Sequence, residues 1–541
     1  MTIDTSPLQD QRSDGPGKPD RPTPLGSGTR TPWWATTVKW VSLTLVVLIG
    51  AYLVQRVISA GYGFAVVLVA LVVMAILAVY STRRAVAMKY LLPGLILLLA
   101  LQIWPIVYTV ATAFTNYGDG HAISKDEATR SIIASSVQEI AGTPRYRMSV
   151  AVKSGSDVAT ADLSLLLTDP AGKSYVGTPT GLADLRGDGV TKTATGKVTA
   201  APGFTILNAR QINVRSKDLS ALAIPTADGG GVKPVGLSEA FVGRTTIVYD
   251  AGADTLTDTT TKKVYVPKNA FWAPRDGQGD PYATGWKENV GLSNFTTLLT
   301  NETIRAGFVK ILVWNIAFAA ISVGSTFLLG MLLALLFNDD RLKGRRIFRS
   351  ILILPYAIPG FVTALLWASM FNQQFGLINT LTHLDVDWLG NPWAAKAAIL
   401  ITNLWLGFPY MFLVCTGALQ SIPGDVREAA KVDGASPART LRSIIMPLLL
   451  VAVGPLLIAS FAFNFNNFGL IFLLTKGGPF ESTDTSIGST DLLITYAFRL
   501  AFSGVSPNYG LASTVSIFIF VIVALMSYSG FRRTKSLEEV N

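Results

Sequence analysis

Long hydrophobic runs constrain this chain more than any other feature of its sequence. Eight runs are long enough to cross a bilayer as a helix, which takes roughly 20 residues. Half of the 541 residues are hydrophobic and only 15% are charged, whereas soluble domains carry about 25% charged residues. The sequence therefore predicts an all-α polytopic membrane protein with eight transmembrane helices, at Val38–Ile58, Phe64–Tyr80, Tyr90–Phe114, Gly307–Phe337, Ser350–Met370, Ala394–Leu419, Ile444–Leu474 and Leu511–Tyr528.

Basic residues are distributed unevenly among the segments that join these runs. If the N-terminus is inside the cell, the short cytoplasmic segments (82–89, 338–349, 421–443 and 531–541) carry 15 Lys+Arg and 7 Asp+Glu. The short external loops (59–62, 373–393 and 475–508) then carry 2 and 5. An excess of basic residues marks the cytoplasmic side of a membrane protein. We therefore expect both termini to be cytoplasmic, and the net charge of +10 does not indicate nucleic acid.

The segment 117–302 contains no long hydrophobic run and has a balanced charge, with 19 Lys+Arg and 19 Asp+Glu. Alternating stretches such as Arg147–Lys153 and Thr245–Tyr249 are typical of strands, and Asp169-Pro170 and Gly229–Gly231 are typical of turns. The sequence thus predicts a mainly β external domain inserted between helices 3 and 4, more consistent with a docking surface than with a linker. Ala171–Ser174 resembles the end of a phosphate-binding loop, but the glycine that such a loop needs is missing.

These observations define the expected domain organisation. The polar segment 1–33 contains six prolines and is expected to be a disordered cytoplasmic tail. Helices 1–3 follow in 34–116, the external domain in 117–302, and a core with helices 4–8 in 303–530. Residues 531–541 form a second cytoplasmic tail.

Few residues in this chain are suited to catalysis or metal binding. Cys415 is the only cysteine, and the two histidines, His121 and His383, are far apart. We therefore expect no catalytic site, no metal and no cofactor. The predicted spans carry no charged residue near their middles, since Lys310 and Lys396 lie close to the ends. Ion-coupled carriers usually need ionisable groups at depth, so the sequence favours a neutral cargo and an energy source in a partner.

Two of the predicted spans carry a polar and aromatic stripe on one helical face. The i, i+3, i+4, i+7 spacing occurs in Ser460, Phe463, Asn464 and Asn467, and again in Asn403, Leu406, Gly407 and Tyr410. Amides can exchange hydrogen bonds with the hydroxyl groups of a sugar, and aromatic rings can cover the apolar face of a pyranose. The alternative is contact between helices, where each hydrogen bond adds about 0.6 kcal/mol. The residues alone leave both interpretations open.

The loop between the two striped spans, 421–447, has the capping residues of two short helices. Asp425 is expected to cap the first helix, with Glu428 at its third position and Gly434 at its end. Ser436 is expected to cap the second helix, with Pro437 at its first position. The sequence therefore predicts a helix–turn–helix that projects into the cytoplasm.

This loop resembles a known motif. Glu428-Ala-Ala430, Gly434 and Ile445-Met-Pro447 resemble the EAA loop of ABC importer permeases. Within that family, the chain is most like the larger membrane subunit of maltose/maltodextrin importers. That likeness rests on the eight predicted spans with a large external domain after the third, on the Ser460–Asn467 stripe, on Leu474–Pro479 and on Trp405–Tyr410. It is strong over about 300–530 and weak in sequence over 117–302.

The resemblance implies roles for the motif residues. The eight stripe residues would line a transmembrane sugar site, and Glu428, Ala429, Ala430 and Gly434 would couple it to an ATPase. The expected partners are a second permease subunit, a dimer of ATPase subunits and an extracytoplasmic sugar-binding protein. The cargo would be maltose or maltodextrin, and the location the bacterial plasma (inner) membrane. The chain itself would not be an enzyme, and alternating access would be its mechanism.

Three alternatives stay open. The same machine could carry another neutral sugar such as trehalose, whereas a glycerol phosphate would need cationic groups among the stripe residues. A membrane receptor or scaffold would use the external domain for recognition but would have no use for a coupling loop. An ion-coupled sugar carrier is disfavoured by the charge-free middles of the spans.

Overall fold

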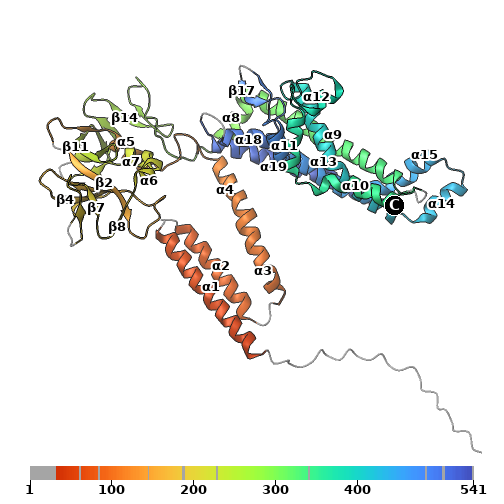
Figure 1. Cartoon of the computed structure of the whole chain (residues 1–541), viewed down its shortest axis with the longest axis horizontal. Helices are drawn as coiled ribbons and strands as arrows, with labels where there is room; N and C mark the ends of the chain where they lie inside the picture. Colours follow the sequence, from red (N-terminus) through yellow and green to blue (C-terminus); the bar gives the residue numbers. More distant parts are fainter. Residues whose placement is uncertain are drawn as a thin grey trace, which may run out of the picture. The chain divides into compact units, whose positions relative to one another are not determined.

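A computed structural model describes residues 32–538, except 60–62, 83–85, 144, 186–188, 227–229, 339–341, 482–483 and 503–505 (Figure 1). Most of the predicted tail 1–33 therefore lies outside the described residues, as do parts of the loops 59–62, 82–89 and 338–349 and of the tail 531–541. The chain divides into two compact units, 1–106 and 107–541.

The first unit begins with a hairpin of two apolar helices, α1 (Trp33–Ser59) and α2 (Gly63–Ser81). A Cβ added at Gly50 would lie 2.6 Å from Cγ2 of Val73, so the glycine allows the two helices to pack closely. Lys39 Nζ donates a hydrogen bond to the carbonyl of Ser81 at 3.0 Å. The third predicted run follows as α3 (Val86–Leu98), a π-helical turn (Leu99–Ile103) and α4 (Trp104–Ala113), which continues into the second unit.

A β-rich domain lies between α4 and α9 (Glu302–Leu336) in chain order. Its larger sheet has nine antiparallel strands in the order β5-β4-β3-β2-β11-β10-β9, with β1 paired to β11 and β8 paired to β2. A second sheet has four strands in the order β12-β13-β14-β15. The strands are β1 (Val137–Glu139), β2 (Tyr146–Lys153), β3 (Ser164–Thr168), β4 (Ser174–Thr178), β5 (Gly181–Asp184), β6 (Thr191–Lys192), β7 (Val198–Ala200), β8 (Phe204–Ile206), β9 (Ile224–Pro225), β10 (Gly230–Val235), β11 (Glu239–Thr245), β12 (Ile247–Asp250), β13 (Thr255–Asp258), β14 (Val264–Lys268) and β15 (Phe271–Pro274).

Alternating side chains of β2 and β3 form the core under the larger sheet, together with two short helices, α6 (Ala209–Val214) and α7 (Ser216–Ala221). Met148, Val150 and Val152 of β2 are almost fully buried there. A third helix, α5 (Lys125–Ser135), packs in a separate core with residues of the second sheet, including Leu256 and Trp272. The prediction of a mainly β domain is thus confirmed, and its helices stayed unpredicted because they are short.

Three local predictions in this domain had different outcomes. Arg147–Lys153 lies in β2, and Asp169-Pro170 begins the turn between β3 and β4, as predicted. The turn predicted at Gly229–Gly231 is wrong for its last two residues, which begin β10 and pair with β11; Gly229 lies outside the described residues. A Cβ at Gly231 would lie 3.3 Å from Val137 Cγ2, so this glycine allows close packing within the sheet.

The helical core of the second unit contains the remaining apolar helices. They are α9, α10 (Arg345–Ala357), α11 (Gly360–Met370), α13 (Pro392–Ser421), α16 (Met446–Phe465), α17 (Phe468–Leu474), α18 (Leu493–Phe502) and α19 (Tyr509–Glu538). In the described residues of the whole chain, six helices are long and apolar enough to cross a membrane, or seven if α10 and α11 form one bent span. The predicted count of eight also requires α2, a shorter apolar helix, and it stays a prediction.

Two of the predicted spans are broken into two helices each. The run Ser350–Met370 becomes α10 and α11, which meet at an angle of 90°. Pro359 follows the end of α10, and a residue that precedes proline disfavours helical backbone angles. The run Ile444–Leu474 becomes α16 and α17, separated at Asn466 and Asn467. Broken helices are tolerated at membrane depth where other parts of the protein or a cavity satisfy the freed backbone groups.

The loop between α13 and α16 contains α14 (Gly424–Val432) and α15 (Pro437–Thr440), and a π-helical turn (Leu441–Ile445) joins α15 to α16. α14 and α15 follow the C-terminal end of α13, whereas α12 (Leu377–Thr382) precedes its N-terminal end. The two segments therefore lie at opposite ends of this 30-residue helix (Figure 1).

Candidate functional site

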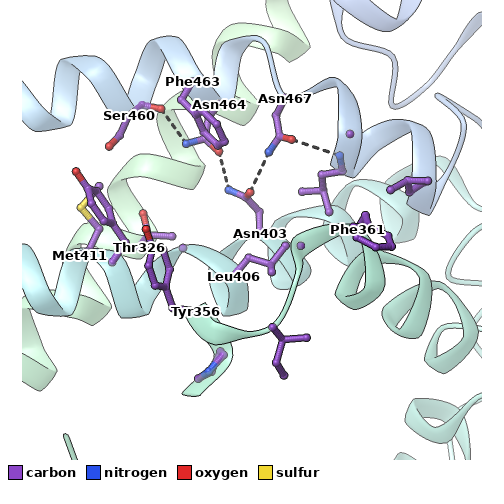
Figure 2. A pocket seen from close by; sticks show the side chains of 18 of the residues that line it. Thr326, Tyr356, Phe361, Asn403, Leu406, Met411, Ser460, Phe463, Asn464 and Asn467 are labelled. Carbon is purple, nitrogen blue, oxygen red and sulfur yellow. Dashed lines mark hydrogen bonds between the residues drawn. The ribbon is translucent and has the colours of Figure 1, made fainter. Parts of the chain in front are cut away.

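A cavity of about 730 Å³ lies where the two helix breaks face α13. All eight residues of the predicted stripes line it: Asn403, Leu406, Gly407, Tyr410, Ser460, Phe463, Asn464 and Asn467. Figure 2 shows the stripe of α16 and its C-terminal break facing Asn403 and Leu406 of α13. The helical spacing thus placed these side chains on the correct faces, and the structure brings the two faces together.

Three amide side chains form a continuous hydrogen-bonded chain at this cavity, which we call the amide ladder (Asn467, Asn403 and Asn464). Asn467 Nδ2 donates to Asn403 Oδ1 at 3.3 Å, and Asn403 Nδ2 donates to Asn464 Oδ1 at 2.9 Å (Figure 2). Asn464 Nδ2 then donates to the carbonyl of Ser460 at 2.9 Å. A carboxamide has two N–H donors and two lone pairs, so each ladder amide is held in place with capacity left for a ligand.

Asn467 also shapes the backbone at the break. Its side-chain oxygen accepts a hydrogen bond from the backbone N–H of Leu470 at 3.3 Å, which makes it the N-cap of α17. The same side chain therefore begins a helix and joins the amide ladder. The i, i+3, i+4, i+7 spacing predicted the face but gave no sign that the helix ends at this residue.

Aromatic rings border the polar ladder. Phe463 is 72% exposed, which is unusual for a phenylalanine among packed helices and leaves its ring free for contact. Tyr410 of α13 stacks with Tyr356 of α10, with ring centroids 6.5 Å apart and an interplanar angle of 24°. The cavity therefore combines hydrogen-bonding amides with apolar ring faces.

Gly407 of α13 packs against Thr326 of α9 beside the cavity. A Cβ at this position would lie 2.8 Å from Cγ2 of Thr326, a distance shorter than van der Waals contact. Thr326 itself lines the cavity. Gly407 thus shapes the wall by permitting helix contact.

Sequence reasoning missed several residues that line the cavity. Tyr356 and Phe361 come from α10 and α11, Thr326 comes from α9, and Met411 follows Tyr410 on α13. A signal for two of them was present in the sequence, because Pro355, Pro359 and Gly360 interrupt the hydrophobic run Ser350–Met370. Interrupted hydrophobic segments often mark the binding site of a transporter.

The predicted coupling residues lie on α14 and the turn after it. Glu428, Ala429 and Gly434 are exposed, whereas Ala430 is buried. Gly434 has φ of +72°, and the N–H of Ala435 bonds to the carbonyl of Ala430 at 2.9 Å. This is the Schellman arrangement that ends helices at a glycine, so the predicted end of the helix is confirmed.

The predicted beginning of this helix is wrong. α14 begins at Gly424, the residue before it is Pro423, and no side chain caps the helix. Asp425 therefore lies inside the first turn, where its charge still favours the positive end of the helix dipole. Proline at this position sets the backbone direction, which the capping pattern in the sequence did not take into account. The predicted second cap is confirmed, because Ser436 Oγ accepts from the N–H of Arg439 at 3.3 Å.

The two lysines near the ends of predicted spans have partners outside the cavity. Lys310 Nζ lies 3.1 Å from Glu481 Oε1, and Lys396 Nζ lies 5.0 Å from the ring centre of Trp314 and 4.7 Å from that of Trp393. In the part of the chain that the structure describes, no group of three His, Cys, Asp or Glu side chains could hold a metal ion.

Comparison with known proteins identifies the family. Residues 326–535 match the model of the binding-protein-dependent transport system inner membrane component, and residues 96–180 match the N-terminal region of the transmembrane subunit in binding-protein-dependent ABC transporters. The maltose/maltodextrin transport system permease protein MalF of Yersinia pestis is 35% identical over 527 residues, covering 93% of this chain and 95% of the relative. The chain belongs to the MalF family of ABC importer permeases. The Escherichia coli K12 relative of the same name is 34% identical over 518 residues, covering 93% and 98%.

Membership of the MalF family confirms the resemblance drawn from the EAA-like loop. The chain is a multi-pass inner-membrane permease, and the ATPase activity of such importers resides in separate subunits, so the chain is not itself an enzyme. A solved bacterial ABC transporter involved in the import of alginate aligns with a TM-score of 0.40 and 23% identity, covering 46% of this chain and 84% of that chain.

Proposed function

We propose that this MalF-family permease forms the translocation path for maltose or maltodextrin and binds the sugar in the cavity between α10, α11, α13, α16 and α17. The chemistry of the lining is the main support. The amide ladder offers donors and acceptors to hydroxyl groups, and Phe463 and Tyr410 offer ring faces. None of the described residues that line the cavity is charged, which fits a neutral cargo. Each of the eight stripe residues is proposed as a sugar-site residue on this basis.

The partners of the importer are proposed from the surfaces that the chain leaves open. A second permease subunit would complete the cavity on the side where Phe463 is exposed. A dimer of ATPase subunits would dock on the exposed side of α14, with Glu428, Ala429, Ala430 and Gly434 as the coupling residues. An extracytoplasmic sugar-binding protein would dock on the β-rich domain, which is joined to the start of α19 by the bridge between Gly118 and Asn508.

The proposed mechanism is alternating access. The binding protein delivers sugar while ATP closes the ATPase dimer, and movement of α14 turns the cavity outward. ATP hydrolysis then returns the cavity to the cytoplasmic side. A ligand or a partner can drive such a change only if it binds the two states with different affinity. Because the amide ladder spans α13 and the α16–α17 break, relative movement of these helices would change how the sugar is held.

If the cargo is another sugar, or if the chain belongs to another functional class, the expected results differ. Another neutral sugar such as trehalose would use the same ladder and rings, so competition assays must separate it from maltose. A receptor or scaffold would not need the exposed α14. A sodium-coupled carrier would work without ATP.

Uptake of radiolabelled maltose into proteoliposomes tests the proposal. The vesicles hold this chain with its cognate second permease subunit, ATPase and binding protein, with ATP inside. Asn464→Ala removes a ladder amide, and Phe463→Ala removes the exposed ring. Asn466→Ala is the matched control, because its amide lies on the same break and bonds to the carbonyl of Ala462.

We expect ATP-dependent uptake by the parent and by the control, and at least a tenfold loss in the two site variants, with assembly and sugar-independent ATPase activity retained. Uptake that is unaffected by either site change would show that the stripe serves helix contact only. An active complex that carries another solute but never maltose would overturn the sugar assignment and leave the importer assignment intact.

A further inference from the structure

A buried asparagine outside the cavity connects three elements of the helical core. Asn315 of α9 is fully buried, at 0% exposure. Its Nδ2 donates to the backbone carbonyl of Phe465 at 2.9 Å, and its Oδ1 accepts from the backbone N–H of Leu493 at 2.8 Å. Phe465 is the last residue of α16, and Leu493 is the first residue of α18. One side chain thus joins α9 to the end of one helix and to the start of another.

Both backbone groups need this partner. The last carbonyls of a helix have no donor within that helix, and its first N–H groups have no acceptor. In a membrane interior, water does not replace these partners. Phe465 is buried at 0% exposure. The carboxamide of Asn315 supplies a donor to one group and an acceptor to the other. An apolar side chain of similar size would leave both groups without a partner.

The Phe465 carbonyl lies between two members of the amide ladder. Asn464 precedes it at the end of α16, and Asn467 follows two residues later as the N-cap of α17. The ladder requires both amides to reach Asn403, at 2.9 Å and 3.3 Å. A change in backbone direction at Phe465 would alter these two distances together, because they lie on opposite sides of the break.

The N-terminal end of α18, to which Asn315 also bonds, is held in place by a second buried side chain. Asp491 is fully buried and bonds to Arg499 at 2.8 Å and to Thr495 Oγ1 at 2.9 Å. Thr495 Oγ1 also accepts from the N–H of Leu492 at 2.9 Å. The start of α18 is therefore fixed, and Asn315 connects the α16–α17 break to a fixed point.

We infer that Asn315 is a positioning residue for the sugar site: it holds the α16–α17 break so that Asn464 and Asn467 keep the spacing that lets both bond to Asn403. Asn315 does not touch the sugar. The expected effect on maltose transport rests on the proposed function. The expected effect on the structure of the α16–α17 break can be measured without sugar.

Two variants of Asn315 and one control test this role. Asn315→Leu removes both hydrogen bonds at similar volume. Asn315→Thr is milder, because its shorter hydroxyl bonds within its own helix instead. Ser322→Ala is the matched control, since Ser322 lies on the same helix at 0% exposure and its hydroxyl has no hydrogen-bond partner within the described part of the chain. Each variant is studied in the assembled importer in lipid nanodiscs or proteoliposomes.

The first measurement is amide hydrogen exchange without sugar. We expect faster exchange in the peptide that covers 464–474 for Asn315→Leu and Asn315→Thr, and unchanged exchange in the peptide that covers 395–410 of α13. Ser322→Ala should match the parent in both. Parental exchange over 464–474 in an assembled Asn315 variant would overturn the inference, whether or not the complex transports maltose.

The second measurement compares transport with ATPase activity. Loss of a buried hydrogen bond of this kind lowers an equilibrium constant by about tenfold, so we expect maltose uptake to fall by about that factor while sugar-independent ATPase activity is retained. Asn464→Ala combined with Asn315→Leu should lose no more uptake than Asn464→Ala alone, because both act through the same ladder. Additive losses, or parental uptake in Asn315→Leu, would contradict a positioning role. If the parent itself does not carry maltose, the proposed function fails and the exchange data still decide the role of Asn315.

Discussion

Gly407 shows how a single residue can determine both helix packing and the shape of the cavity. A methyl group there would meet Thr326 Cγ2 at 2.8 Å, so we expect Gly407→Ala to destabilise the protein by about 1–3 kcal/mol, as overpacking of a close contact does. Thermal unfolding of the purified protein in detergent measures this loss. Gly417→Ala is the control, since a Cβ at Gly417 on the same helix would meet nothing within 4 Å.

A compensating change makes the prediction for Gly407 specific. Thr326→Ser removes the Cγ2 methyl group that the new alanine would meet, and it keeps the hydroxyl that bonds to the carbonyl of Ser322 at 2.7 Å. The double variant should recover most of the lost stability. Equal stability of Gly407→Ala and Gly417→Ala would show that the helices adjust without strain.

At the residue scale, the sequence determined which side chains share a face but not which partners they meet. The spacing of Asn464 and Asn467 predicted one stripe, and all eight stripe residues line the cavity. The bonds to Asn403 join residues more than 60 positions apart, and helical periodicity carries no information about such pairs. Thr326 was missed because no stripe was predicted on its helix, and Tyr356 was missed although Pro355, Pro359 and Gly360 interrupt its hydrophobic run.

At the scale of helices and turns, the turn after α14 depends on a backbone conformation that favours glycine. Gly434 has φ of +72°, and a Cβ there would meet nothing within 4 Å, so Gly434→Ala tests backbone strain alone. An L-residue in the left-handed region costs about 1–2 kcal/mol. We expect Gly434→Ala to distort the α14–α15 turn and to lower sugar-stimulated ATPase activity and uptake by about fivefold, with binding of the sugar-binding protein unchanged.

The matched control for this turn is Gly424→Ala. Gly424 begins α14, a Cβ there meets nothing within 4 Å, and its φ lies outside the strained range. Alanine favours the helix at such a position, so this variant should couple as well as the parent. If Gly434→Ala and Gly424→Ala show equal sugar-stimulated ATPase activity and uptake, the geometry of the α14–α15 turn is not needed to couple ATP hydrolysis to transport.

In the β-rich domain, α5 begins with a capping box that makes its stability depend on pH. Ser124 Oγ accepts from the N–H of Glu127, and the Glu127 carboxylate accepts from the N–H of Ser124 at 2.9 Å. The backbone N–H of Ser124 lowers the pKa of Glu127 below its ordinary value of 4.5, and the Ser124 hydroxyl adds to this effect. A carboxyl group with a lowered pKa in the folded state contributes stability above its ordinary pKa, and this contribution is lost as pH falls through the lowered value.

Glu127→Gln separates titration from capping, because glutamine can form the same box without a charge that titrates. We expect the parent to unfold about 1–2 °C above this variant at pH 7, and the difference to vanish as the pH falls below 4.5. Amide hydrogen exchange during heating, in peptides that cover α5 and the neighbouring Trp272 and Trp286 of the same core cluster, follows this domain in the intact protein. A difference that does not change between pH 7 and pH 3.5 would contradict the role of the Glu127 charge.

The existence of elements was predicted more reliably than their ends. Hydrophobic runs located the apolar helices, yet they did not show that two runs are broken at Pro359 and at Asn466. The capping pattern gave the end of α14 at Gly434 correctly and its beginning at Asp425 incorrectly. Helix ends depend on how side chains and backbone groups meet after folding, whereas a hydrophobic run depends only on composition.

For the whole molecule, the open question is how many times the chain crosses the membrane. The β-rich domain must be external for a binding protein to dock on it, and α14 must be cytoplasmic for an ATPase to reach it. The hydrophobic runs predict three crossings before the external domain, which require a cytoplasmic N-terminus. If the hairpin of α1 and the shorter α2 gives only one crossing, the N-terminus must be on the external side. The number of crossings before the domain therefore determines the side on which residues 1–31 lie.

Single cysteines decide between these arrangements. In a Cys415→Ser background, we expect a membrane-impermeant maleimide to label Val214→Cys in intact spheroplasts, and to label Val432→Cys and Ser13→Cys only after the membrane is permeabilised. Val214 and Val432 are suitable because they are 82% and 86% exposed. Labelling of Ser13→Cys in intact spheroplasts, with the other two variants as expected, would place the N-terminus and the β-rich domain on the same side of the membrane. The number of crossings between them would then be even rather than three, and the predicted total of eight would be wrong. Labelling of Val432→Cys in intact spheroplasts would instead contradict the cytoplasmic position of α14 and, with it, the proposed coupling to an ATPase.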